Sequence, residues 1–230
     1  LSGVEVGVEP LRHYPYADLC FHVIGYVGEI TCDEMKEDTS YALGDYMGKM
    51  GLERYYDRIL RGIHGIEYAE VDARGKAVGA VVEKRTVPPV AGVDIKTTLD
   101  IALTESVGVF LEEFERAACI CIDPRSGAVL VLYSKPGFDP NLFIHGLSAQ
   151  QWNGLINDPE APMYNRVTMS CYPPGSTYKP FVALAALDSR MITVEKRFDP
   201  CFGTYRLGRR NFNCWKKHGS LNLHGALVNS

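Results

Sequence analysis

Two adjacent prolines, Pro88 and Pro89, separate two stretches of different pattern in this chain of 230 residues. Proline fixes its φ angle and lacks a backbone N–H, so a pair interrupts both helices and strand ladders. Before this point glycines recur every few residues, which favours turns and short strands. After it, apolar residues recur at helical spacing. The sequence therefore predicts two modules, residues 1–90 and residues 91–230.

The second module is predicted to be α+β, with helices packed on an antiparallel sheet. Its helices are expected over residues 100–115, 148–156 and 181–187, and the last is apolar nearly all round, which indicates a core helix. Alternating apolar runs over 117–122 and 128–133, joined by Asp123-Pro-Arg-Ser-Gly, predict a hairpin. In the first module a helix is expected over 52–60 and a hairpin over 68–78, turning at 73–75.

Composition excludes some partners. The net charge is −4 with both signs mixed along the chain, so nothing indicates nucleic-acid binding. No apolar run approaches the roughly 20 residues that span a bilayer. We expect both ends of the sequence to lie within a domain of a longer protein. The absence of a membrane anchor from this stretch therefore says little about that protein. The seven cysteines cannot all form disulfides with one another, because their number is odd. Cys119 and Cys121 alternate with isoleucines, so we expect both thiols on one face of a strand, in the core.

Ser176 and Lys179 form the strongest candidate for chemistry. Pro173, Pro174 and Gly175 force a turn, and Ser176 then opens the apolar helix. Residues three apart on a helix are neighbours, so the lysine can reach the serine hydroxyl. A serine nucleophile needs such a base, a lysine serves only where its surroundings lower its pKa, and a helix N-terminus suits a developing oxyanion. The residues alone fit equally well an ordinary N-cap serine and a solvated lysine.

The segment Pro173-Pro-Gly-Ser-Thr-Tyr-Lys-Pro resembles the active-site segment of class B penicillin-binding proteins, specifically the elongation type. The resemblance covers nearly the whole chain, in the family's order. Its other segments are His13-Tyr-Pro-Tyr, His22-Val-Ile-Gly-Tyr-Val-Gly, Gly51-Leu-Glu-Arg-Tyr-Tyr, Thr97-Thr-Leu-Asp, Asp123-Pro-Arg-Ser-Gly-Ala-Val-Leu, Phe138-Asp-Pro-Asn-Leu-Phe, Ile156-Asn-Asp-Pro and Trp215-Lys-Lys. It implies that residues 1–90 are the end of a pedestal module and 91–230 the start of a transpeptidase domain.

The resemblance also implies a function. Ser176 would attack the D-Ala-D-Ala carbonyl of a peptidoglycan stem peptide, an amine of a neighbouring stem would resolve the acyl-enzyme, and β-lactams would acylate the same serine. The expected location is the bacterial inner membrane, through an anchor outside this chain, with the catalytic domain on the periplasmic side. The pedestal would dock a scaffold protein of the elongation machinery, and no cofactor would be required.

The family's second motif aligns with Ser230, the last residue. The downstream Lys-Thr/Ser-Gly strand, which supplies an oxyanion N–H, is not in this sequence. The resemblance therefore implies half of an active site, and we expect this stretch alone to be inactive.

A zinc ion is a further expectation, because some relatives of this subclass hold one beside the active site. By alignment, Asp199, Cys214 and His218 fall on three of its ligand positions, and the Cys214-x-x-x-His218 spacing suits tetrahedral zinc. Cys201 is a substitute ligand, less favoured than Cys214, and the fourth position follows Ser230. An unliganded loop is the alternative.

Two rival functions remain at this point. A soluble D,D-carboxypeptidase or serine β-lactamase shares the Ser-x-x-Lys pattern, although the pedestal-like first module argues against it. The other rival is a non-catalytic module, which docks a scaffold protein or only senses β-lactams.

Overall fold

The computed structural model describes residues 11–73, 77–80, 85–144 and 146–229, which fall into two compact units, 1–170 and 171–230. In order, the first unit contains η1 (Ala17–Cys20), α1 (Phe21–Ile24), β1 (Val27–Glu29), α2 (Cys32–Glu37), β2 (Tyr46–Gly48), α3 (Gly51–Tyr55), α4 (Asp57–Leu60), β3 (Ala69–Val71), β4 (Ala77–Ala80), α5 (Ile101–Phe110), β5 (Ala117–Ile122), β6 (Val129–Lys135), α6 (Asn141–Ile144), α7 (Ala149–Ile156) and α8 (Arg166–Met169). The second contains η2 (Gly175–Tyr178), α9 (Lys179–Asp188), β7 (Thr204–Leu207), β8 (Arg210–Asn213) and α10 (Leu223–Val228).

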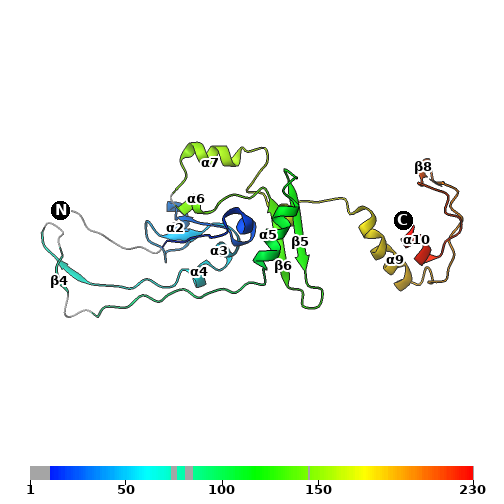
Figure 1. Ribbon diagram of the computed structural model, residues 1–230. Helices are drawn as coiled ribbons and strands as arrows, with labels where there is room; N and C mark the ends of the chain where they lie inside the picture. The colour runs from blue at the N-terminus through cyan, green and yellow to red at the C-terminus, as the bar shows by residue number, and fades with distance from the viewer. Residues whose placement is uncertain (1–10, 74–76, 81–84, 145, 230) are drawn as a thin grey trace. The chain divides into compact units, whose positions relative to one another are not determined.

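The described strands form four two-stranded antiparallel sheets, and α5 packs against β6 (Figure 1). Helix α5 begins where the Asp100 side chain accepts a hydrogen bond from the Leu103 N–H. In β5 the cysteines face the half-buried side and the isoleucines face solvent, as alternation predicts. The α+β class and the hairpin expected over residues 117–133 are thus confirmed.

Phe21, Phe143 and Leu155 form the core of the first unit, with Tyr26 stacked on Phe143 at 3.7 Å between ring centroids. This core joins segments from both sides of the proline pair. The backbone N–H and C=O of Tyr14 exchange hydrogen bonds of 2.9 Å with the Asn141 side chain. The stretches around residues 14–26 and 138–155 therefore fold as one body.

Two of the expected helices differ in extent. The helix expected over 52–60 is two short helices, α3 and α4, that meet at Tyr56. The helix expected over 100–115 ends at Phe110, because Leu111 leaves the helical conformation and the chain turns toward β5. The helix expected over 148–156 is α7, which follows a capping box formed by Ser148 and Gln151. The turn expected at 73–75 lies mostly outside the described residues.

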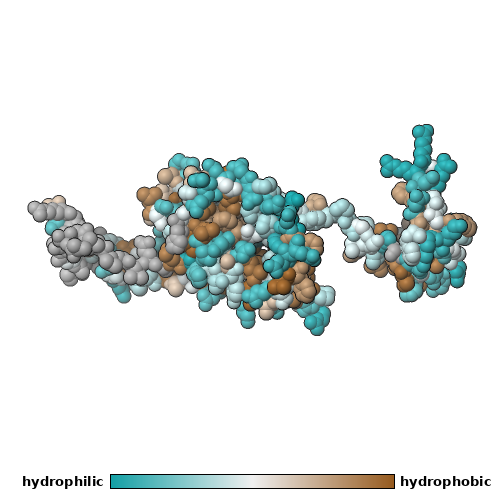
Figure 2. All heavy atoms as spheres, turned by 45° about the horizontal axis from the view of Figure 1, so that its top comes forward, coloured by the Kyte–Doolittle hydropathy of each residue, from teal (hydrophilic) through white to brown (hydrophobic). Residues whose placement is uncertain are grey.

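The expectation that residues 181–187 form a core helix is wrong in this structure. Helix α9, at Lys179–Asp188, contains the predicted run and lies beside α10, yet none of its residues is buried. Phe181 is 65% exposed, and apolar (brown) atoms reach the surface of the unit in Figure 2. The physical reason is the size of the unit: the sixty residues from 171 to 230 supply too few side chains to cover a helix on all sides.

Candidate active site and metal-binding group

Ser176 lies in η2, a 3-10 turn that runs directly into α9. The turn begins at Gly175, whose φ of +55° is a conformation that other residues adopt only with strain. The Thr177 N–H donates to the Pro174 carbonyl at 3.3 Å, which closes the turn. The expectation that Ser176 opens the α-helix is therefore refined: the serine sits one 3-10 turn before the first α-helical residue, Lys179.

The 3-10 geometry keeps Ser176 and Lys179 together. Side chains three apart eclipse one another in a 3-10 turn, and the Lys179 N–H donates a hydrogen bond to the Ser176 carbonyl. Both residues are exposed within this unit. Ser230 lies outside the described residues. The structure thus places the serine and lysine of the predicted site at the two ends of one 3-10 turn.

The β7–β8 hairpin brings two cysteines together. Cys201 lies just before β7, and Cys214 lies just after β8. The Cys214 N–H donates to the Gly203 carbonyl at 2.9 Å, which extends the strand ladder to the base of the hairpin. Residues on opposite sides of such a base are neighbours although 13 positions separate them in the sequence.

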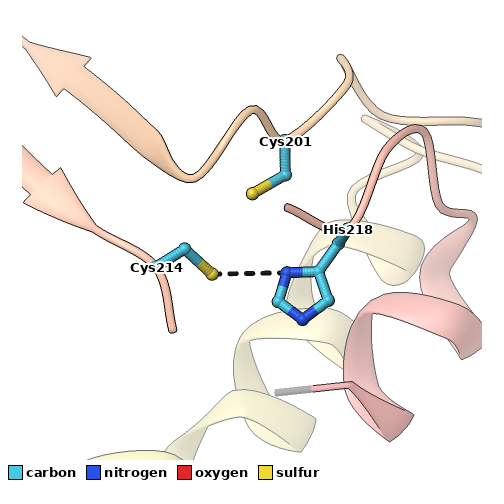
Figure 3. A group of neighbouring side chains, drawn as sticks. All are labelled: Cys201, Cys214 and His218. Atoms are coloured by element: carbon cyan, nitrogen blue, oxygen red, sulfur yellow. Dashed lines mark hydrogen bonds between the residues drawn. The ribbon is translucent and has the colours of Figure 1, made fainter. Parts of the chain in front are cut away.

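His218 joins the cysteines through a second backbone contact. Cys201 and Gly219 exchange two backbone hydrogen bonds, of 2.9 and 3.2 Å, which hold the segment beside the hairpin. The His218 Nδ1 lies 3.3 Å from the Cys214 Sγ, as Figure 3 shows. Its ring meets the Trp215 ring edge-on, with 5.0 Å between centroids.

Ligand atoms of Cys201, Cys214 and His218 all lie within 4.8 Å of one another (Figure 3). Tetrahedral zinc, with bonds of about 2.3 Å to sulfur and 2.0–2.1 Å to nitrogen, holds such atoms about 3.5–3.8 Å apart. Hydrogen bonds from the backbone and side chain of His218, and then from Gly203, lower the pKa of the Cys201 thiol to about 6. The donor set therefore fits a soft divalent ion.

The structure separates Asp199 from the other residues of the expected metal site. Cys214 and His218 come together as the sequence predicts. Among the described residues the third member of the group is Cys201, and Asp199 is an exposed residue outside it. The alignment with relatives favoured Cys214 over Cys201 as a ligand, and Cys201 comes close to the others only through the pairing of β7 with β8. A hairpin signal around Gly208, whose φ is +60°, could have indicated it.

Two family models cover most of the chain. The model of the penicillin-binding protein dimerisation domain matches residues 1–97, and that of the penicillin-binding protein transpeptidase domain matches residues 117–230. The chain belongs to the penicillin-binding proteins. The turn at Ser176 lies inside the transpeptidase match.

The sequence similarity to curated penicillin-binding proteins covers nearly the whole chain. The peptidoglycan D,D-transpeptidase MrdA of Escherichia coli K12 is 41% identical over 99% of this chain and 37% of the relative, and that of Haemophilus influenzae is 37% identical over 95% and 34%. The chain thus spans little more than a third of the length of these relatives.

Solved structures of penicillin-binding protein 2 share the fold. The Helicobacter pylori protein in its complex with MreC matches with a TM-score of 0.80 and 30% identity, over 94% of this chain and 40% of that one. The Pseudomonas aeruginosa protein in complex with WCK 5153 matches with a TM-score of 0.76 and 34% identity, over 94% of this chain and 44% of that one.

Within the part of the chain that the structure describes, no helix is long and apolar enough to cross a membrane.

Proposed function

We propose that this chain is part of a peptidoglycan D,D-transpeptidase in which Ser176 is the nucleophile and Lys179 its base. The observation that carries the proposal is the Pro-Pro-Gly-Ser-x-x-Lys turn, in which a 3-10 geometry sets the serine and lysine on one side at the entrance of α9. The curated relatives named D,D-transpeptidases support the reaction type. Residues 1–90 are the pedestal in this proposal, and 91–230 the start of the catalytic domain.

The reaction has two steps. Lys179 Nζ accepts the proton of the Ser176 hydroxyl as its oxygen attacks the D-Ala-D-Ala carbonyl of a stem peptide. The bond to the terminal D-Ala breaks, and that residue leaves with a proton on its amine. An amine of a second stem then attacks the acyl-enzyme, which forms the cross-link and frees Ser176. Ser230, from the second family motif, is the proposed partner in proton transfer.

The test uses the full-length protein that contains this chain. After treatment with a β-lactam, peptide mass spectrometry is expected to find the acyl adduct on the peptide that carries Ser176. The Ser176→Ala variant is expected to lose the adduct, whereas Ser189→Ala, at the other end of α9, keeps it. An adduct on another serine, or labelling that persists in Ser176→Ala, refutes the assignment.

Product analysis then separates the transpeptidase from its rivals. With a stem pentapeptide and an acceptor amine, a transpeptidase yields the cross-linked dimer, whereas a carboxypeptidase yields only the shortened peptide. A β-lactamase releases hydrolysed β-lactam, and a sensor or docking module turns over neither. Only the cross-linked product agrees with the proposal.

We propose the inner membrane as the location, through an anchor outside the described residues, with the catalytic domain on the periplasmic side. The pedestal is the proposed docking surface for a scaffold protein. The Helicobacter pylori structure, a complex of penicillin-binding protein 2 with MreC, supports this partner class. Fractionation of cells and copurification with the scaffold test these two statements separately.

We also propose that Cys214 and His218 bind zinc. The ion plays no part in the acyl transfer, which needs no cofactor. Its role is structural: it supplies a cross-link between the end of β8 and the segment before α10, close in sequence to the second motif at Ser230. Elemental analysis of protein purified without chelator, compared with His218→Ala, tests this, and equal zinc in both refutes it.

A further inference from the structure

We infer that Cys201, and not Asp199, is the third protein ligand of the metal site, and that the site is consequently lost on oxidation through a Cys201–Cys214 disulfide. This inference rests on the proposed zinc site at Cys214 and His218. The basis is the ligand group itself, in which Cys201 lies within 4.8 Å of both other donors.

Backbone contacts on both sides fix Cys201 in this place. On one side it pairs with Gly219, the residue after His218, and on the other it lies two residues before Gly203, which pairs with Cys214. Its Sγ also donates to the Lys216 carbonyl at 3.7 Å. Cys201 is half-buried, whereas Asp199 is exposed. Backbone pairing with the segments that carry Cys214 and His218 therefore keeps the Cys201 sulfur close to the other two ligand atoms.

Two thiolates and an imidazole make a different site from one dominated by carboxylates. Thiolate ligands favour soft ions such as Zn²⁺ over Mg²⁺, Ca²⁺ or Mn²⁺. The His218 ring is positioned by the Trp215 ring beside it, and its Nε2 is buried with no hydrogen-bond partner among the described residues. A bound ion would fix this ring in one orientation.

The same two thiols are close enough to react with each other. When a peroxide oxidises the pair, the two sulfurs together lose two electrons and form one S–S bond. The peroxide takes up these two electrons and two protons, and its O–O bond breaks. An organic peroxide yields water and an alcohol, and hydrogen peroxide yields two waters. A disulfide has no thiolate to offer, so the metal is released. A thiol reductant restores both ligands.

Matched variants of the intact protein test the ligand assignment. Cys201→Ser is expected to weaken zinc binding at least about tenfold, because even loss of an outer-shell partner costs about 10–100-fold. Asp199→Asn and Cys171→Ser, which change residues of the same unit outside the group, are expected to bind zinc as the wild type does. Loss of zinc in Asp199→Asn with retention in Cys201→Ser overturns the assignment, and no zinc in reduced wild type refutes the underlying site as well.

Alkylation of the wild type decides the question even if Cys201→Ser fails to fold. With zinc bound, iodoacetamide labelling of Cys201 is expected to slow at least about tenfold relative to chelator-treated protein, since a coordinated thiolate is protected. Labelling of Cys171, which is exposed in the same unit, should not change. Equal labelling of Cys201 in both states overturns the assignment.

Hydrogen peroxide tests the oxidation step. The wild type is expected to release zinc to a colorimetric chelator while peptide mass spectrometry finds residues 201 and 214 joined by a disulfide. Dithiothreitol followed by added zinc should restore metal binding. Zinc retained through the treatment, or zinc lost with Cys201 and Cys214 both still reduced, refutes the disulfide switch.

Discussion

The two compact units of this penicillin-binding protein are held in different ways. In the first unit Phe21 is fully buried and sits in an aromatic cluster with Phe138 and Phe143. In the second, no residue described between 171 and 229 is buried, and Phe181 is 65% exposed. The first unit is stabilised by a core, whereas hairpin and bridge hydrogen bonds define the second.

Buried polar groups show the same contrast. Glu53 is 5% exposed in the first unit and is paired with the Arg12 Nε at 2.8 Å and the Tyr14 hydroxyl at 3.2 Å. In the second unit the candidate residues Ser176, Lys179 and Cys214 are exposed. The residues proposed for chemistry are thus positioned by local backbone geometry and not by a buried core. Their substitution should therefore affect chemistry more than stability.

The largest expected effect is on acylation. Lys179→Ala should lower the rate of β-lactam acylation of the full-length protein by about 10²–10⁴-fold, because loss of a general base removes that much. The melting temperature should stay near that of the wild type, since the side chain is exposed. Stopped-flow acylation and thermal melts measure the two effects.

Lys196→Ala, an exposed lysine beyond the same helix, is the control and should acylate at the wild-type rate. If Lys179→Ala acylates as fast as this control, Lys179 is a surface cation and the proposed active site is refuted.

A pair of phenylalanines tests the difference in packing directly. Phe21→Ala should lower the free energy of unfolding by about 3–5 kcal/mol, because it leaves a cavity in the core. Phe181→Ala should change it by only about 0.5 kcal/mol, as at other exposed positions. Urea unfolding followed by circular dichroism measures both. Equal destabilisation by the two variants would mean that α9 is covered in solution, and the contrast between the units would fail.

Tyr14 tests the buried polar network of the first unit. Its hydroxyl accepts from the Val27 N–H at 3.0 Å and donates to Glu53. Tyr14→Phe leaves both groups without that partner and should cost about 1–3 kcal/mol, the penalty for unsatisfied buried groups. Tyr16→Phe, at a position 48% exposed, should fall within about 0.5 kcal/mol of the wild type by the same measurement. A neutral Tyr14→Phe would show that water replaces the hydroxyl.

Local signals in the sequence predicted much of the fold. The helices expected over 100–115 and 148–156 and the strand expected over 117–122 all begin within one residue of the expected position. These features depend on neighbours in the chain. The burial of α9 was predicted wrongly because an all-round apolar pattern reports only the need for partners. Whether partners are present depends on the rest of the fold.

Local sequence also predicted one part of the candidate site residues, whereas the other part depends on strand pairing. Ser176 and Lys179 could be placed on one turn because they are three positions apart and prolines precede them. The membership of Cys201 could not be read from spacing, since it depends on the register of β7 against β8 and on the bridge to Gly219. A one-residue change in such a register would turn the side chain to the other face.

The smallest expected effect concerns Glu34, an N-terminal helix residue of the first unit. Hydrogen bonds from Lys49 and from the Thr31 N–H lower the pKa of its carboxyl from 4.5 to about 2. Because the pKa of Glu34 is lower in the folded state, its ionised carboxylate adds to the free energy of unfolding above pH 4.5. This contribution is lost as the pH falls toward 2. Because the side chain is one-third exposed, we expect only about 1 kcal/mol.

Glu34→Gln keeps a side-chain acceptor for the capping box at Thr31 but removes the charge. Urea titrations at pH 6 and pH 3 should therefore show a smaller loss of stability on acidification than in the wild type. Glu37→Gln, an exposed change in the same helix, is the control and should leave the wild-type difference intact. Equal acid sensitivity of Glu34→Gln and the wild type would show that this ion pair adds nothing to the core-based stability of the first unit.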